Sequence, residues 1–533
     1  MKVVVIGLDG ATFRLLKPWA KCGELPAIAK LLKDGSHGAL ESSLPHVTYP
    51  AWKCYSTGKY PNKLGVYHFF SIDFTNRLIK IPFSHSFNAL EIWDYLGING
   101  FRVAIVNMPT TYPPKKVNGI MISGPVIVGD NYTYPTNLKD YIEKKFNYKP
   151  DTKEIDEELR DIELGRADRS AILEKIREHI ESQFSLLHKY ILPNNFDFVH
   201  LTIFYIDAIQ HFFWADMENN DKEFGNVILE FWKEIDNNIM KIIKRLDEDT
   251  ILILMSDHGF TKLKGIFYLN NWLYKRGYIK LNRKFLILNF LNKLGLNSDN
   301  LYKSLTKLRL IDLARRVLPR NLRGVIPNRN TEISIDFASS LIDWNKTKAI
   351  MVGDGVIYIN PKIPNKDAVI DKLIKELSTI ISPLDGKKVC EKIYKISELY
   401  GSKSENDPDI IILPSEGYLF KNTIAGKEWN FEIGKWSAIH DLYGIFIAYG
   451  KGIKKGYKVK EVRIYDVAPT ILHIFGLPVP NDMDGRVLME IFEENSEFSN
   501  RQPVYVSPSY YASKSEKEKI EKRIKELKRM KKL

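Results

Sequence analysis

Seven residues spread along the chain have the chemistry of ligands for two metal ions. In chain order they are Asp9, Thr48, Asp207, His211, Asp257, His258 and His440. Oxygen and nitrogen donors of this kind bind divalent cations. Each of them lies beside an apolar run or on a predicted helix just beyond one, where an open α/β sheet gathers its ligands. The set predicts a metal-dependent enzyme that acts on a phosphate or sulfate ester.

Continuous apolar runs, which are typical of buried parallel strands, end just before three of the carboxylates. These runs are residues 3–8 before Asp9, 250–255 before Asp257 and 196–204 before Asp207. His440 instead comes shortly before a strand-like run at 444–449.

Local geometry predicts how the paired ligands converge. If a helix begins at Asp207, positions i and i+4 share one face, so Asp207 and His211 point the same way. Asp257 and His258 are adjacent and reach one ion only in a turn beyond the strand, which Gly259 would permit.

Each position also has an ordinary structural explanation. An aspartate after a strand is often a helix cap or a turn residue, a lone Asp-x3-His pair is usually a solvated helix face, and a lone histidine such as His440 is usually structural. The occurrence of all of them in one chain, each beside its own strand, favours the site.

The elements that must position these residues alternate along the chain. Strand signals occur at 3–8, 102–107, 197–204, 250–255, 409–413 and 445–449, and helical patterns at 165–190 and 225–246. Such alternation predicts an α/β fold with a mostly parallel central sheet flanked by helices.

Longer motifs surround the candidate ligands, and in them the chain resembles the alkaline phosphatase superfamily. Within it, the chain is most similar to the type I phosphodiesterase/nucleotide pyrophosphatase branch and to its prokaryotic group of predicted phosphohydrolases or phosphomutases. The motifs span nearly the whole chain and are residues 6–11, 47–52, 56–61, 256–259, 440–444, 466–472 and 476–478.

The resemblance implies an alkaline-phosphatase-like core with inserted cap segments, and it divides the ligands between two ions. Asp9, Thr48, Asp257 and His258 would hold one ion, and Asp207, His211 and His440 the other. Donors without thiolate suit Zn²⁺, with Mn²⁺ as the alternative. Two ions about 3.5–4 Å apart stabilise the entering and leaving oxygens of a displacement together.

Thr48 would be the nucleophile, activated by a metal ion, and would form a phosphothreonine that water then releases. The other interpretation is a turn or N-cap residue before Pro50. Both roles are compatible, because a helix N-terminus also attracts phosphoryl oxygens. Sulfatase activity is disfavoured because those relatives have a cysteine or serine at this position.

One stretch departs from the pattern of nucleotide pyrophosphatases. They have a His-Gly-Ile motif followed by an asparagine that contacts the phosphoryl group, whereas residues 63–69 here read KLGVYHF. Lys63 or His68 would replace that contact, or either is a surface residue. Because no arginine adjoins Thr48 either, monoester and diester substrates both stay open.

Composition is that of a globular enzyme. The 533 residues are 44% hydrophobic and 27% charged, which predicts one large domain with insertions. The three cysteines form no CxxC motif or even-numbered disulfide set, and residues 1–8 lack the anatomy of a signal peptide. With no apolar run near 18 residues long, we expect a cytoplasmic protein.

We divide the chain into four segments. They are a first part of the catalytic core at 1–261 with an insertion at about 109–195, a basic cap at 262–345, a second core part at 346–510, and a charged tail at 511–533 that is helical or disordered. The tail would dock on the core, pair with another subunit or touch a membrane.

The cap segment carries an excess of 11 positive charges in a chain whose net charge is +13. It would be a lid that steers a small anionic, phosphate-containing substrate, or a solvated basic surface. Nucleic acid is disfavoured as a partner because no recognised motif supports it. An apolar run at 285–291 beside Arg283 suits peripheral contact with an anionic membrane, or is the packed face of a helix.

The leading hypothesis is hydrolysis of phosphodiester or pyrophosphate bonds. The alternatives are a phosphotransferase or phosphomutase, a phosphomonoesterase acting on a lipid-linked or nucleotide substrate, and a binding protein with a degenerate site. Only the last of these would fail to bind two metal ions.

Overall fold

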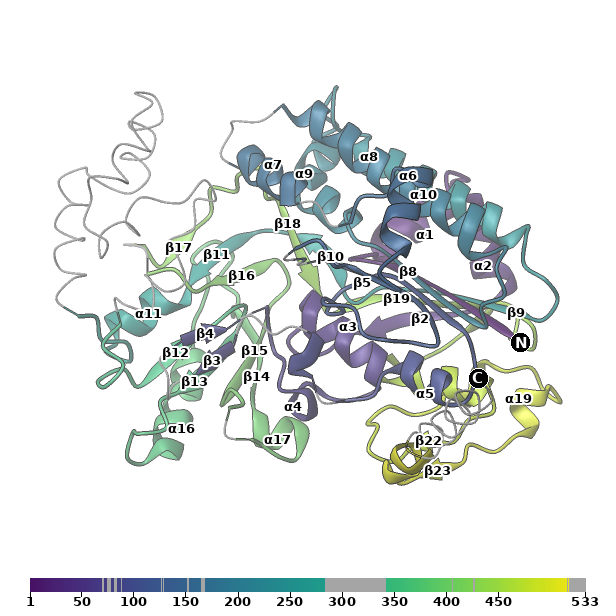
Figure 1. Ribbon diagram of the computed structural model, residues 1–533. Helices are drawn as coiled ribbons and strands as arrows, with labels where there is room; N and C mark the ends of the chain where they lie inside the picture. Colours follow the sequence, from purple (N-terminus) through teal and green to yellow (C-terminus); the bar gives the residue numbers. More distant parts are fainter. Residues whose placement is uncertain are drawn as a thin grey trace. The chain divides into compact units, whose positions relative to one another are not determined.

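The fold comes from a computed structural model (Figure 1). It describes residues 1–69, 71–73, 78–80, 84–87, 89–125, 127, 129–150, 153–163, 168–282, 342–404, 406–424, 427–514 and 516. The chain forms two compact units. The first unit is Met1–Tyr67, Pro82–Leu263 and Ile433–Leu533, and the second is His68–Ile81 and Lys264–Glu432.

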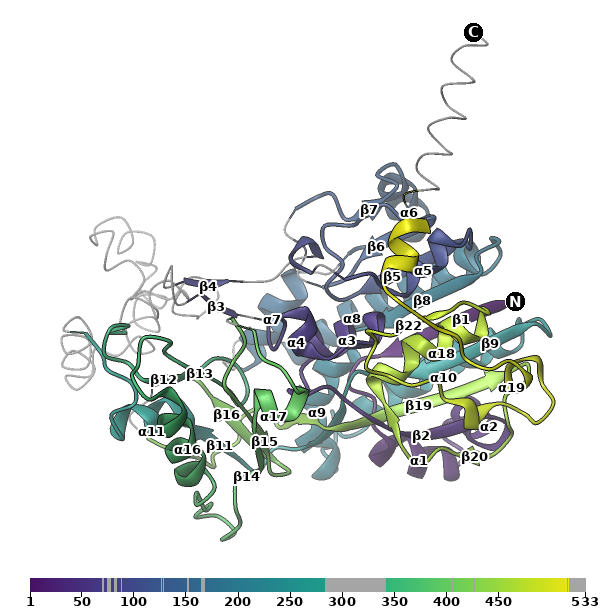
Figure 2. The ribbon, with the colours of Figure 1, turned by 90° about the horizontal axis from the view of Figure 1, so that it is seen from below.

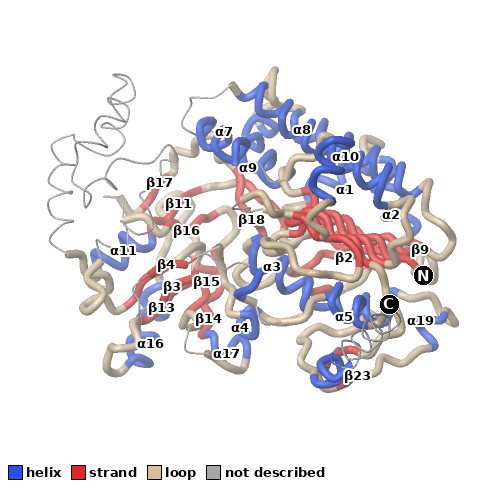
Figure 3. Tube along the Cα trace, viewed as in Figure 1, coloured by secondary structure: helices blue, strands red, loops and turns tan. Residues whose placement is uncertain are grey.

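A ten-stranded sheet forms the centre of the first unit, in the order β20-β2-β19-β9-β1-β8-β5-β6-β7, with β21 on β2 (Figure 3). Its strands are β1 (Lys2–Leu8), β2 (Ser36–Glu41), β5 (Val103–Met108), β6 (Gly119–Ser123), β7 (Thr133–Tyr134), β8 (Phe198–Ile203), β9 (Thr250–Met255), β19 (Tyr443–Gly450), β20 (Tyr457–Lys458) and β21 (Val462–Arg463). β1 pairs in parallel with β8 and β9, and β5 with β6 and β8. β19 pairs antiparallel with β9 and β2, and β7 pairs antiparallel with β6. Since the other pairs are parallel, the sheet is mostly parallel, as predicted.

Strand β1 is apolar throughout because both of its faces are buried. Val4, Ile6 and Leu8 pack into one hydrophobic cluster, and Val3 and Val5 into another on the opposite face.

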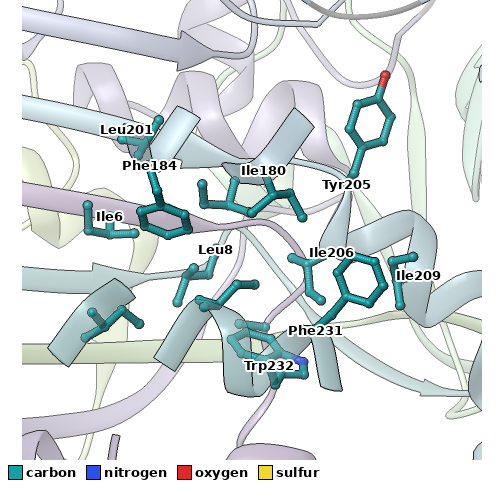
Figure 4. Close-up of a cluster of buried hydrophobic side chains, with 14 of the residues drawn as sticks. Ile6, Leu8, Ile180, Phe184, Leu201, Tyr205, Ile206, Ile209, Phe231 and Trp232 are labelled. Carbon is teal, nitrogen blue, oxygen red and sulfur yellow. The ribbon is translucent and has the colours of Figure 1, made fainter. Parts of the chain in front are cut away.

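Helices cover both faces of this sheet. On the face of Ile6 and Leu8 lie α1 (Phe13–Lys21), α2 (Pro26–Asp34), α8 (Arg169–Leu186) with the π-helix Leu187–Ile191, α9 (Ile206–Glu218) and α10 (Val227–Ile243). Figure 4 shows Phe184 of α8, Ile206 of α9 and Trp232 of α10 around these strand residues. On the other face lie α3 (Thr48–Thr57), α5 (Ile92–Ile98) and α18 (Val467–Ile474).

Smaller elements complete the first unit. They are α4 (Pro61–Leu64), α6 (Leu138–Phe146), α7 (Lys153–Glu163), α19 (Glu497–Asn500), the pair β10 (Gly259–Lys262) and β18 (Ala438–Asp441), and the pair β22 (Val479–Pro480) and β23 (Tyr505–Val506). Within the described ranges, we find no helix with both the length and the apolar content to cross a bilayer.

The second unit has its own sheets. One joins β12 (Ala349–Met351), β13 (Val356–Ile359), β15 (Ile410–Pro414) and β14 (Cys390–Lys395), and another joins β16 (Tyr418–Lys421), β11 (Gly265–Tyr268) and β17 (Trp429–Asn430). The rest are β3 (Ser71–Asp73), β4 (Leu78–Lys80), α11 (Leu269–Lys275), α16 (Lys366–Leu377) and α17 (Ile396–Tyr400), the last beside β14 in Figure 2.

The strand signal at 409–413 is β15, which belongs to the antiparallel sheet of the second unit and not to the central sheet. Residues 346–432, which we place in the catalytic core from sequence, likewise fall in the second unit. An apolar run encodes burial but not the strand with which it pairs. Most of the basic cap, including the run at 285–291, and the tail after 516 lie outside the described residues.

A buried ion pair joins α3 to the start of α5. The Nζ of Lys53 lies 2.8 Å from Oε1 of Glu91, and the two side chains are 2% and 4% exposed. Lys115 Nζ lies 2.7 Å from the other carboxylate oxygen, and Ser56 Oγ donates a hydrogen bond of 2.9 Å to Oε1. Burial alone would raise the pKa of Glu91, but Lys115 and Lys53 outweigh it and lower this pKa from 4.5 to about 2.

We expect Glu91→Gln to lower the free energy of unfolding at pH 7 by about 3–5 kcal/mol, because it leaves Lys53 buried without its counter-charge. The depressed pKa means that the carboxylate stabilises the fold above pH 4.5 and that this stabilisation is lost as the pH falls towards 2. Urea unfolding at pH 7 and pH 3 should therefore show a smaller difference between variant and wild type at pH 3.

The control for this prediction is Asp34→Asn, which breaks an exposed pair with Lys30. It should cost less than about 1 kcal/mol. Equal losses in the two variants would contradict the prediction.

Candidate active site

The structure brings all seven predicted residues together in the first unit, at the carboxyl ends of β1, β8 and β9. Asp9 follows β1, Asp257 and His258 follow β9, and Asp207 and His211 lie on the first turns of α9, which follows β8. Thr48 is the first residue of α3, and His440 lies on β18.

One half of the cluster surrounds His258. Its Nε2 lies 3.3 Å from Thr48 Oγ1, 3.2 Å from Asp257 Oδ2 and 3.6 Å from Asp9 Oδ1. The Nδ1 of His258 lies 3.1 Å from the carbonyl oxygen of Gly259, and because a carbonyl only accepts, Nδ1 is the donor. Nε2 of the neutral ring is then the acceptor, so the Thr48 hydroxyl donates to it.

The other half of the cluster surrounds Asp207. Its Oδ2 lies 3.3 Å from His211 Nε2, and its Oδ1 lies 3.2 Å from His440 Nε2. Because His211 Nδ1 donates to the carbonyl oxygen of Ala438 at 2.7 Å, Nε2 is the ring nitrogen that faces the cluster, where it also lies 3.1 Å from His440 Nε2. Oδ1 of Asp207 is also 4.0 Å from His258 Nε2, so this carboxylate lies between the two halves.

Among the residues that the structure describes, two triads have donor atoms within 4.8 Å of one another, and both contain Asp207. They are Asp207, His211 and His440, and Asp9, Asp207 and His258. The first is the complete set that the resemblance implies for one ion. In the second, Asp207 stands where the resemblance has Asp257, whose Oδ2 nevertheless adjoins His258.

Three buried carboxylate oxygens in this cluster, Asp9 Oδ1, Asp207 Oδ1 and Asp257 Oδ2, make no hydrogen bond within the described part of the chain. Buried charges are ordinarily paired, hydrogen-bonded or bound to a metal. Oxygen and imidazole donors without thiolate fit Zn²⁺ or Mn²⁺, so the residues present suit divalent cations.

Burial and neighbouring charges shift the pKa values of the three carboxylates. Burial, reinforced by Asp257 and Asp207, raises the pKa of Asp9 well above its usual range, and burial raises the pKa of Asp257 to about 7. Burial would also raise the pKa of Asp207, but His211 and His440 hold it well below the usual range. Burial lowers the pKa of His258 and keeps its ring neutral. Cations between these carboxylates would relieve the repulsion.

Two glycines shape the loops that carry the ligands. Gly10 has φ +69°, and its amide donates to Asp257 Oδ1 at 3.1 Å. From sequence we expect Gly259 to permit the turn that carries Asp257 and His258, but Gly259 is not among the glycines with positive φ. It is needed because a Cβ there would lie 2.0 Å from the carbonyl oxygen of Tyr443.

The start of α3 also differs from expectation. The helix begins at Thr48 itself, the N-cap is Val47, and Pro50 is the third helical residue instead of the first. Thr48 therefore stands at the positive end of the helix dipole without acting as its cap.

Lys63 and His68, the two residues considered from sequence for the missing phosphoryl contact, have partners outside the seven predicted residues. Lys63 Nζ is 2.7 Å from Asp484 Oδ1 and donates to the carbonyl oxygen of Asp482 at 2.9 Å. His68 belongs to the second unit, where its Nε2 lies 3.9 Å from Asp354 Oδ2.

Aromatic residues that we did not single out from sequence pack against the histidines. Trp436 stacks on His211 with ring centroids 3.7 Å apart, and Phe260 lies edge-on to both His211 and His440. Phe260 follows His258 by two residues and Trp436 precedes His440 by four, and this proximity to candidate ligands is the signal that sequence offers.

Comparison with known proteins supplies a family. A family model described as "Type I phosphodiesterase / nucleotide pyrophosphatase" matches residues 3–437. No curated protein matches the sequence.

Similar solved structures include human ectonucleotide pyrophosphatase/phosphodiesterase 5, at 12% identity over 93% of this chain and 100% of that one, with a TM-score of 0.49. The murine protein is 14% identical over 94% of this chain and 99% of its own, with a TM-score of 0.48. An inactive variant of it in complex with AMP gives 14% identity, 94% and 98% coverage and a TM-score of 0.48.

We expect the purified protein to bind two divalent ions and His440→Ala to bind one, because His440 is in only one triad. Asp207→Ala should bind neither tightly, because its carboxylate is in both. Elemental analysis after dialysis against Zn²⁺ measures the stoichiometry. Asp216→Ala, on α9 but paired with Arg169, is the control and should keep both ions. Two ions retained by the Asp207 variant would contradict the shared role.

Proposed function

Because the chain belongs to the type I phosphodiesterase/nucleotide pyrophosphatase family of hydrolases, we propose that it cleaves phosphodiester or pyrophosphate bonds through Thr48 with the help of two divalent ions. The observation that carries this proposal is the position of Thr48. Its hydroxyl lies 3.3 Å from His258 Nε2 at the N-terminus of a ten-residue helix, in a cluster with the buried carboxylates of Asp9 and Asp257 and the partly buried carboxylate of Asp207.

In this proposal the residues of the cluster form two sets, each of which would hold one metal ion. Asp9, Asp257, His258 and Thr48 hold one ion, His211 and His440 hold the other, and Asp207 lies between them. When bound, Zn²⁺ or Mn²⁺ supplies positive charge that activates a hydroxyl and stabilises the oxygens of the displacement.

The protein's own groups account for the rest of the reaction. The Thr48 hydroxyl, which the structure places 3.3 Å from His258 Nε2, gives up its proton to water. Thr48 Oγ1 forms a bond to phosphorus while the bond to the leaving oxygen breaks, and the leaving oxygen takes a proton from water. The positive end of α3 faces the phosphoryl oxygens. Water then attacks phosphorus in the phosphothreonine, the bond to Thr48 breaks, and the hydroxyl is restored.

Thr48→Ala should lower turnover of bis(p-nitrophenyl) phosphate by on the order of 1,000-fold or more, because the variant has no nucleophile. Release of nitrophenol from the Zn²⁺-loaded protein is the measurement, run in parallel with the p-nitrophenyl monoester. Faster turnover of the diester would support the proposed substrate class, whereas preference for the monoester would favour a phosphatase.

A matched control for this variant is Thr57→Ala. Thr57 is buried in the same helix, and its hydroxyl donates to the carbonyl oxygen of Lys53 at 2.8 Å, away from the ligands. It should keep nearly full activity. Turnover that persists without metal, or in Thr48→Ala, would overturn the proposal.

A further inference from the structure

Trp52 contacts one of the candidate metal ligands directly. Its indole Nε1 donates a hydrogen bond of 2.9 Å to Asp9 Oδ2, and both residues are fully buried. The other oxygen, Asp9 Oδ1, makes no hydrogen bond among the described residues and points toward His258 Nε2, 3.6 Å away. The indole therefore occupies a lone pair of one oxygen of Asp9, and the second oxygen faces the cluster.

The same helix carries the candidate nucleophile. Thr48 and Trp52 are four residues apart on α3, so their side chains lie on one face of the helix. Thr48 reaches His258 and Trp52 reaches Asp9. One helical turn thus fixes the nucleophile and a ligand of the cluster relative to each other.

The indole ring of Trp52 is closely packed on several sides. A Cβ at Gly7 of β1 would lie 2.5 Å from Cη2 of Trp52, so only glycine leaves room for the ring. The rings of Tyr55 and His200 pack edge-on to the indole, each at a centroid distance of 5.8 Å. Tyr55 and His200 are joined in turn by a hydrogen bond of 3.0 Å. The ring is held by β1, β8 and its own helix, which fixes the direction of its N–H.

We propose that Trp52 is a positioning residue of the metal centre, which orients Asp9 so that Oδ1 would be the oxygen offered to a divalent cation. This inference rests on the proposed function, because it assigns Trp52 a role toward the ions of that site. Groups that hydrogen-bond to metal ligands fix the orientation of those ligands, and their loss typically weakens metal binding by about 10–100-fold.

The competing explanation is that Trp52 is only a core residue. It belongs to the hydrophobic cluster on its face of the sheet, so its truncation would destabilise the protein in either case. Metal affinity separates the two explanations, since loss of packing alone leaves the affinity of the folded site unchanged.

The experiment compares Trp52→Phe with Trp232→Phe. Trp232 is equally buried, lies on α10, and its indole N–H makes no hydrogen bond within the described ranges, so the same atoms are removed away from the site. The affinity of each metal-free protein for Zn²⁺ is measured by competition with a chelator, and thermal unfolding confirms that each is folded. We expect about 10–100-fold weaker binding of one ion to Trp52→Phe and wild-type affinity in Trp232→Phe.

If Trp52→Phe does not fold, Gly7→Ala tests the same contact, because its new Cβ displaces the indole while keeping the N–H. Wild-type affinity in the folded Trp52 variant, or in Gly7→Ala in its place, would overturn the inference, as would an equal loss in Trp232→Phe. Wild-type protein that binds no Zn²⁺ would overturn the proposed function as well. Two ions bound by wild type, with Trp52→Phe unaffected, would remove only the role of Trp52.

Discussion

The gathering of three carboxylates, two buried and one partly buried, at one edge of the central sheet is the constraint on which the rest of the first unit depends. Asp9, Asp207 and Asp257 are close enough to raise or lower one another's protonation, and burial removes the water that would screen them. The amide of Gly10 donates to Asp257 and the indole of Trp52 donates to Asp9. Imidazole nitrogens of the cluster lie 3.2–3.3 Å from oxygens of Asp207 and Asp257. Divalent cations would offset the repulsion between these carboxylates, which favours cation binding at this site.

Helix α3 connects the carboxylate cluster to the hydrophobic core. All ten of its residues are buried, so it is packed on every side. Its first turn carries Thr48, its second carries Trp52, and Lys53 fastens it to Glu91 at the start of α5. Because the contacts on its separate faces all act on one helix, a displacement of any of them would also move Thr48, the proposed nucleophile.

The two strands that border the second unit in sequence also belong to the site. The chain leaves the first unit after β10 and re-enters it before β18, and these two strands pair antiparallel with Phe260 opposite His440. A long inserted segment is tolerated there because its ends are held together by a strand pair. The same pair places His440 across from the loop that carries His258.

The sequence by itself determined the candidate ligands, their order and the elements that carry them. Apolar runs of the right length end at Asp9 and Asp257, and the i, i+4 spacing of Asp207 and His211 requires only a helix at that point, which α9 provides. Such features are local, so the chain encodes them directly. Tertiary structure alone decided that β15 pairs in a separate sheet, that Asp207 lies between the two triads, and that Trp52 meets Asp9. These depend on which distant segments pack together, and apolar residues specify burial without specifying a partner.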